Sequence, residues 1–262
     1  MTEDITLIST NPIRFLFSDE EQIVVGNFRD YLLTKRFNFV ASINNLRDLA
    51  DLYFKIDETW VDAMKTIELL SKREWIVPVQ LTIFCFREIR MAAELLFCCC
   101  TTPGNSHLRS AIESFVHAQK ILKEPGLIKV WLSRDSDRAE YDRYFKANFK
   151  ANLFPKDSGF EHLHSLWQML CEVGPHPNVN SLGLSSSVTT TASEAFWRLE
   201  FFETGQDEIA KNLLLMIQCA LEMFKSTYSS FHEQLSSNPA LLKRLTNGLV
   251  DLGLLKRKYL GG

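Results

Sequence analysis

The chain has 262 residues, a net charge of −3, 46% hydrophobic residues and 23% charged residues. These values are typical of a soluble globular protein with one large domain or two modest ones. They disfavour a strongly electrostatic DNA-binding protein, which needs a concentrated basic face. The one local basic cluster, Lys256 to Lys258, favours a solvated tail over a binding patch.

The N-terminal part of the sequence predicts an arm followed by helices. Residues 1–17 contain apolar residues without a clear period, which we interpret as a packed arm. Ser18 and Glu21 have the spacing of a capping box and predict a helix that runs to about Lys35. Apolar residues then recur at helical spacing as far as about Trp75, and they predict two further helices. Because the first ten residues lack the basic and apolar regions of a secretion signal, we expect a cytoplasmic protein.

A long apolar run at residues 76–100 has the length of a membrane span. Four charged residues lie in its middle: Arg87, Glu88, Arg90 and Glu94. Such charges are costly in hydrocarbon, so the run predicts a core helix of a soluble bundle that starts at Pro78, and no membrane partner.

The next segment predicts the second half of a helical hairpin. Residues 101–105, TTPGN, are typical of a loop, and Ser106 can cap a helix that ends at Pro125. Because the loop is short, we expect the two helices to be antiparallel neighbours at the centre of the fold. Further helices are expected at 135–150 and 158–173.

The segment 180–204 is rich in Ser and Thr and then in aromatic residues. It predicts either a surface loop or a small β-hairpin with arms at 188–191 and 196–202, with no preference between the two. Helices resume at Asp207, and two short helices separated near Gly248 are expected to end the chain.

The sequence as a whole predicts an all-α fold, a multi-helix bundle around the central antiparallel helix hairpin. We expect a single domain, 1–262. Its parts are the N-terminal arm at 1–17, a central bundle at about 38–175, the insertion at 180–204 and the C-terminal helices at 206–260.

The six cysteines include three adjacent ones at 98–100, and none belongs to a C-x-x-C pair. Neighbouring residues on a helix point about 100° apart, which suits neither a shared metal nor a disulfide. We therefore expect reduced, buried thiols and no metal site. His162 and His164 favour surface positions over a metal site for the same geometric reason. The sequence contains none of the common phosphate-loop, dinucleotide, zinc-protease, hydrolase, EF-hand or di-iron motifs, so no cofactor is expected.

Two polar stripes stand out on the central hairpin. Arg87, Arg90 and Glu94 share one face of the first helix, and Arg109, Glu113 and His117 share one face of the second. Both helices are otherwise apolar nearly all round, so these charges must be paired or must line a cavity. Two interpretations follow: a buried salt-bridge lattice that fixes helix register, and a polar pocket in which arginine binds a phosphate or carboxylate group.

Residues 174–178 place His176 between Pro175 and Pro177, with Asn178 next to it. The prolines hold the backbone extended or turned, which is one way for a loop to aim an imidazole inward. The alternative is a stiff turn after a helix, with the histidine exposed.

These residues also carry a resemblance to a known family. The segment LRSAIESFVHAQKIL, with Arg109 and Glu113, resembles the arginine–serine–x–x–glutamate helix of a bacterial all-helical family of unknown function, and SLWQMLCEVGPHP resembles that family's later histidine–proline pair. The family is similar in outline to the HEPN superfamily, whose helical bundles include RNA-cleaving toxins. Catalytic HEPN proteins carry four to six residues between arginine and histidine, whereas seven separate Arg109 from His117 in this chain.

Two functions are therefore predicted. The favoured one is a non-enzymatic binding or interaction module. Its internal pocket would take an anionic small molecule or a partner, and its expected ligand-binding residues are Arg87, Arg90, Glu94, Arg109, Glu113, His117, His176 and Asn178. The alternative is a HEPN-like ribonuclease or toxin-type enzyme that acts on RNA with Arg109 and His176 as catalytic residues. A homodimer is compatible with either function.

Overall fold

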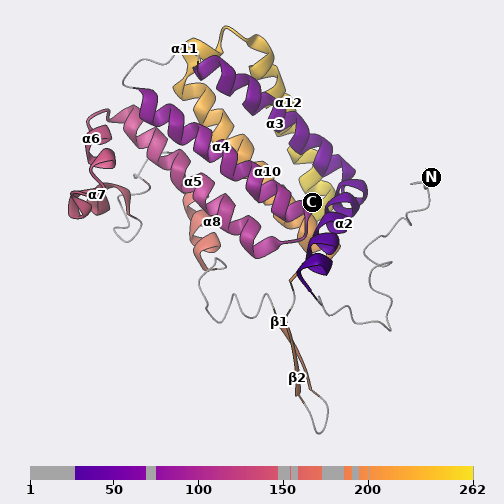
Figure 1. The fold of residues 1–262 in the computed structure, drawn as a ribbon. Helices are drawn as coiled ribbons and strands as arrows, with labels where there is room; N and C mark the ends of the chain where they lie inside the picture. Colours follow the sequence, from indigo (N-terminus) through magenta and orange to yellow (C-terminus); the bar gives the residue numbers. More distant parts are fainter. Residues whose placement is uncertain are drawn as a thin grey trace.

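The protein is described by a computed structural model that covers residues 27–68, 75–146, 154, 159–172, 186–190, 195–199 and 201–261, with the backbone alone at 186–190 and 195–199. The helices are α2 (Phe28–Asn45), α3 (Arg47–Glu68), α4 (Ile76–Phe97), α5 (Thr101–Lys123), α6 (Leu127–Leu132), α7 (Arg138–Phe145), α8 (Glu161–Glu172), α10 (Gln206–Ser230), α11 (His232–Leu235) and α12 (Pro239–Leu260). They form a helical bundle around the α4–α5 hairpin, which confirms the all-α prediction (Figure 1). The predicted arm at 1–17 and the Ser18–Glu21 capping box lie outside the described residues.

The first described helix, α2, extends beyond the predicted helix end near Lys35. Asn27 caps α2, because its side chain accepts hydrogen bonds from the backbone of Arg29 and Asp30 while Asp30 accepts one from the Asn27 backbone. The α2 helix ends at Asn45, and α3 runs from Arg47 without a break to Glu68. The apolar stripes that predicted two helices thus belong to the end of α2 and to one long α3.

The turn between α4 and α5 consists of three buried cysteines, Cys98 to Cys100. The Cys100 N–H donates to the Leu95 carbonyl at 2.8 Å and the Cys99 N–H to the Leu96 carbonyl at 2.9 Å, with Cys99 in the left-handed region at φ 63°. This is the Schellman pattern that usually ends in glycine.

The prediction that Ser106 caps α5 was wrong, because TTPGN forms the first turn of that helix. Pro103 is tolerated there because the first-turn N–H groups have no helical partner. Gly104 lets α5 approach α4 closely, since a Cβ atom at this position would lie 2.9 Å from the Leu96 side chain.

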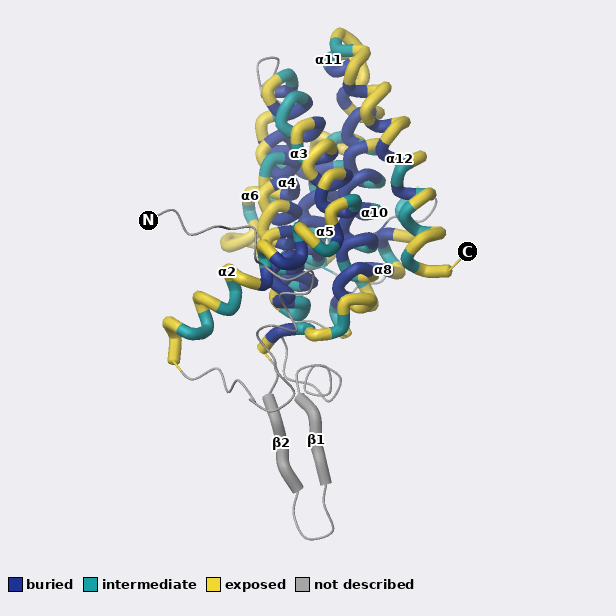
Figure 2. The backbone as a smooth tube through the Cα atoms, turned by 90° about the vertical axis from the view of Figure 1, so that its right-hand side faces the viewer, coloured by how far each residue is buried: buried dark blue, intermediate teal, exposed yellow. Residues whose placement is uncertain are grey.

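The main core lies where α10 crosses α3, α4 and α5 (Figures 1 and 2). Trp60 of α3 is fully buried there, stacks on Phe86 of α4 and meets the edge of Phe224 of α10. Its indole N–H donates to the Ala220 carbonyl at 3.3 Å, which satisfies the one polar atom of that side chain.

The α12 helix packs against α3 and α10 and is continuous through Gly248, so the expected break near this residue was wrong. Gly248 is instead a contact point, because a Cβ atom there would lie 3.1 Å from the Leu221 side chain of α10. A glycine inside an amphipathic stretch therefore marks close helix packing here rather than a helix end.

Two smaller parts flank the bundle. The α6 and α7 helices cover the outer side of α4 and α5, where Tyr141 and Phe145 form a second apolar cluster with Val77, Leu81 and Ile121. The insertion contains the β-hairpin that was one of its two predicted alternatives: β1 (Ser186–Thr190) pairs antiparallel with β2 (Ala195–Leu199).

Candidate functional site

The first predicted polar stripe does not face the second one. Arg90 forms a two-pronged ion pair with Asp57 of α3, with nitrogen–oxygen distances of 2.6 and 2.8 Å. Glu94 binds Lys35 of α2 at 3.2 Å. These two residues of the first stripe are therefore paired with α3 and α2 rather than with the second stripe on α5.

Arg87 makes its contacts within its own helix, α4. Its guanidinium stacks on Phe84, 4.1 Å from the ring centroid, and donates to Glu88 of its own helix at 3.0 Å. The other oxygen of Glu88 lies 2.7 Å from Nδ1 of His107, so this buried carboxylate links α4 to α5. Glu88 and His107 lie outside both predicted stripes, so the helical spacing of the stripes did not indicate this pair.

In the second stripe, Arg109 and Glu113 form an ion pair at 3.5 Å along α5. The same carboxylate accepts a hydrogen bond from the Trp167 indole of α8 at 2.9 Å. Arg109 also lies beside the Cys171 thiol of α8, whose pKa burial raises even though the nearby guanidinium opposes that rise. Arg109 and Glu113 thus help to fix α8 on the hairpin.

Glu113 and His117 also line a cavity of about 580 Å³ between the hairpin and the α6–α7 unit. The hairpin contributes Gln80, Leu81, Phe84, Glu113, Ser114 and His117, and the α6–α7 side contributes Trp131, Arg134, Arg138, Tyr141, Phe145 and Lys146. The cavity brings two predicted ligand-binding residues together with cations that the sequence reasoning had not selected.

Two arginines flank one aromatic ring in this cavity. The guanidinium carbons of Arg134 and Arg138 each lie 5.5 Å from the centroid of the Tyr141 ring. Arg138 and Lys146 share the carboxylate of Asp142 at 2.9 and 3.1 Å. Arg134 makes no ion pair within the described part of the chain, so its charge is available to a ligand. The alternation of arginine with aromatic residues in 131–146 is the sequence signal that could have indicated this wall.

His117 is neutral at physiological pH in this setting. Burial lowers its pKa to about 4, and the nearby charges of Lys120 and Arg134 act in the same direction. Its Nε2 atom lies 3.3 Å from the Phe145 carbonyl, an arrangement in which the neutral ring donates the hydrogen bond. Burial also lowers the pKa of Lys120 to about 8. A neutral, hydrogen-bonded histidine is a positioning group rather than a cation for the ligand.

The structure describes all six cysteines but not the proline-bracketed histidine. His176 and Asn178 lie outside the described residues. All six cysteines are free. Cys171 is partly exposed, and the other five are buried. Burial raises the pKa of Cys98 to about 12 and that of Cys99 to about 11, which makes both thiols poor nucleophiles.

Within the described ranges, no group of three or more metal-ligating side chains occurs. No described helix combines the length and apolarity needed to cross a membrane. Comparison of the chain with models of protein families, with curated proteins and with solved structures finds no match.

Proposed function

We propose that this protein is a non-enzymatic binding module that takes a small anionic ligand in the cavity between the α4–α5 hairpin and the α6–α7 unit. The observation that carries the proposal is Arg134, which makes no ion pair with the described residues and lies at the wall of a cavity of about 580 Å³. Arg138 and Lys146 stand on the same wall, and cations outnumber carboxylates around the cavity. A planar guanidinium binds phosphate or carboxylate oxygens with two parallel hydrogen bonds.

The aromatic walls favour an anion that carries a flat ring. Trp131, Phe84 and Tyr141 line the cavity, and the volume lies within the range of ordinary ligand pockets. A nucleoside monophosphate combines a ring for these walls with a phosphate for Arg134 and Arg138. Because burial lowers the pKa of His117 to about 4, this residue is a weak base near neutral pH, which favours a binding role for it over a role in acid–base chemistry.

The experiment is a calorimetric titration with inorganic phosphate and with adenosine monophosphate. We expect saturable binding of the nucleotide, and at least a tenfold loss of affinity in Arg134→Gln and in Arg138→Gln. The matched control is Arg257→Gln on α12, which lies at the opposite edge of the bundle from α7 (Figure 1) and should leave affinity unchanged. Equal affinity in all three variants, or no binding by the folded wild type, would contradict the proposal.

A HEPN-like ribonuclease that uses Arg109 and His176 is the second candidate that the sequence resemblance suggests. Arg109 is engaged by Glu113 and lies beside Cys171, an arrangement that favours a structural role. A cleavage assay on single-stranded RNA tests the alternative, because activity that disappears in both Arg109→Gln and His176→Ala would replace our proposal. We further propose a cytoplasmic location, which suits six free thiols.

A further inference from the structure

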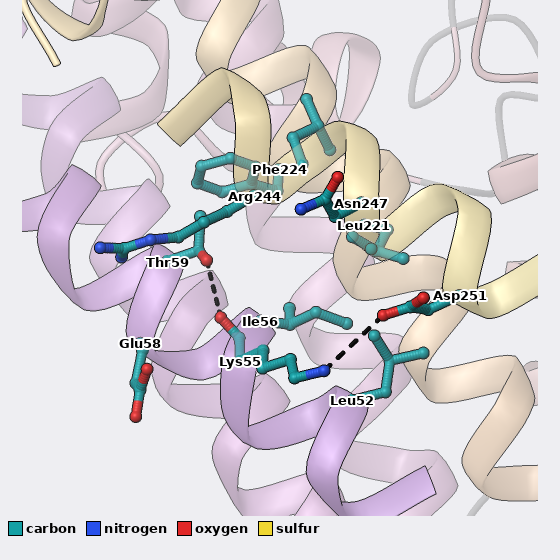
Figure 3. A pocket seen from close by; sticks show the side chains of 12 residues that line it. Leu52, Lys55, Ile56, Glu58, Thr59, Leu221, Phe224, Arg244, Asn247 and Asp251 are labelled. Carbon is teal, nitrogen blue, oxygen red and sulfur yellow. Dashed lines mark hydrogen bonds and ion pairs between the residues drawn. The ribbon is translucent and has the colours of Figure 1, made fainter. Parts of the chain in front are cut away.

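A second cavity, separate from the proposed anion site, lies between α3, α10 and α12 (Figure 3). Its volume is about 240 Å³, and its walls are mostly apolar. The apolar lining consists of Leu52, Ile56, Leu221, Phe224 and Leu245. An apolar cavity of about 150 Å³ is large enough for one benzene molecule, so this slot can hold a branched aliphatic chain or a single ring.

Three ion pairs join α3 to α12 along this interface at intervals of seven residues. Asp48 pairs with Lys258 at 2.6 Å, and Asp62 pairs with Arg244 at 2.6 Å. Between them, Lys55 of α3 faces Asp251 of α12 at 3.8 Å, and Figure 3 shows this pair spanning the two helices beside the slot. The middle pair is the longest of the three, and it is the one in which both residues line the cavity.

In the middle pair the cation lies on α3 and the carboxylate on α12, the reverse of the two outer pairs. Glu58 and Arg244 also line the cavity, and Arg244 is held by Asp62, which leaves Lys55 and Asp251 as the ion pair at the apolar slot. Lys55 and Asp251 have side chains that are 68% and 40% exposed, so a ligand can reach both of them. A pair this exposed and this long contributes little to stability, so inserting a ligand between the two charges costs little. The outer pairs continue to hold α12 on α3.

We propose that the slot binds a free amino acid with a branched or aromatic apolar side chain. Lys55 binds the ligand's carboxylate, Asp251 binds its ammonium group, and the side chain enters the cavity between Leu52, Ile56 and Phe224. The ligand's two charges take the places that Lys55 and Asp251 fill for each other in the free protein. Neither a purely apolar molecule nor a simple anion uses both of these groups.

The test is a calorimetric titration of the full chain with L-leucine and L-phenylalanine. Isovalerate and isoamylamine serve as probes that each lack one of the two charges. We expect saturable binding of at least one amino acid, with affinity at least tenfold above that of either single-charge probe. Lys55→Gln and Asp251→Asn should each weaken amino-acid binding at least tenfold.

The matched control is Lys258→Gln, which breaks an α3–α12 ion pair outside the cavity and should leave affinity within about twofold of wild type. Because Lys55 and Asp251 are surface residues, their variants are expected to fold, and circular dichroism checks this. A Leu245→Phe variant, which narrows the slot, should abolish binding while Arg134→Gln leaves it unchanged.

Three outcomes would overturn the inference. The first is the absence of binding at millimolar amino acid by folded protein. The second is binding that neither Lys55→Gln nor Asp251→Asn weakens, which would assign the slot to an uncharged apolar ligand. The third is equal weakening in Lys258→Gln, which would show that the ion pairs act through helix docking alone.

Discussion

At the scale of single residues, helical spacing singled out charged side chains in the central helices but did not identify their partners. Helical spacing shows that Arg90 and Glu94 share a face, and it does not show which helix covers that face. Their partners, Asp57 and Lys35, come from helices whose rotation about their axes depends on the whole core. By contrast, Glu113 and His117 lie four residues apart on one helix, and both line the same cavity. Binding of a ligand by these residues stays a prediction.

The partly buried His117 ring makes stability depend on pH. Its pKa is about 4 in the folded chain and about 6.5 in an unfolded one, so only the unfolded chain takes up a proton between these values. Stability therefore falls as the pH drops from about 6.5 to about 4, by on the order of 2 kcal/mol for this residue. We expect urea denaturation of His117→Gln to show a smaller loss over this window. An identical pH dependence in wild type and variant would contradict the assignment.

The left-handed conformation of Cys99 gives a second residue-scale prediction. A non-glycine residue in this conformation costs roughly 1 kcal/mol, so glycine at this position offsets the loss of the buried thiol. The neighbouring Cys98 is equally buried but has φ −80°, where glycine brings no relief. We expect Cys98→Gly to destabilise by about 1–2 kcal/mol more than Cys99→Gly in chemical denaturation. The opposite order would show that the thiol of Cys99 matters more than its backbone.

At the scale of helices, the sequence predicted most elements and misplaced several of their ends. Two of these errors, in α5 and α12, occurred where proline or glycine was interpreted as a helix boundary. Pro103 and Gly104 lie inside α5, and Gly248 lies inside α12. A glycine required for close packing and a glycine that ends a helix look alike in a single sequence, because the difference depends on the neighbouring helix.

Alanine substitutions at two helical glycines distinguish a glycine needed for close packing from one that is not. A Cβ atom at Gly104 would lie 2.9 Å from Leu96 and 3.3 Å from the Ala92 carbonyl, whereas one at Gly253 meets nothing within 4 Å. We expect Gly104→Ala to destabilise the protein by roughly 1–3 kcal/mol because the helices must move apart. Gly253→Ala should instead stabilise it by about 0.5–1 kcal/mol through helix propensity. Thermal and urea unfolding measure both changes, and a stabilised Gly104→Ala variant would contradict the contact.

At the scale of the whole molecule, two apolar clusters of unequal size share the α4–α5 hairpin. The large one joins α3, α4, α5, α10 and α12, and the small one holds α6 and α7. The all-α class followed from apolar periodicity alone, because that pattern is local. The division into a large and a small cluster did not follow, because it depends on which face of the hairpin each later helix covers.

This division predicts unequal local stability. The α7 helix buries Tyr141 and Phe145 in the small cluster, while α10 is buried along most of its length. We expect amide hydrogens of α7 to exchange through local opening, well before those of α10. If the proposed anion site is correct, adenosine monophosphate should slow exchange in α7 and leave α10 unchanged. Exchange of both helices at one common rate would indicate a single cooperative unit.

The ion pairs between α3 and α12 also constrain the order in which the chain folds. Asp48 and Lys258 are 210 residues apart, whereas α4 and α5 are joined by a three-residue turn. The cost of closing a loop grows with its length, so the hairpin is expected to form early and α12 to dock late. The slot beside Lys55 and Asp251 exists only after this docking. An amino acid bound there would therefore slow unfolding and leave the folding rate unchanged, since its site is absent from the transition state.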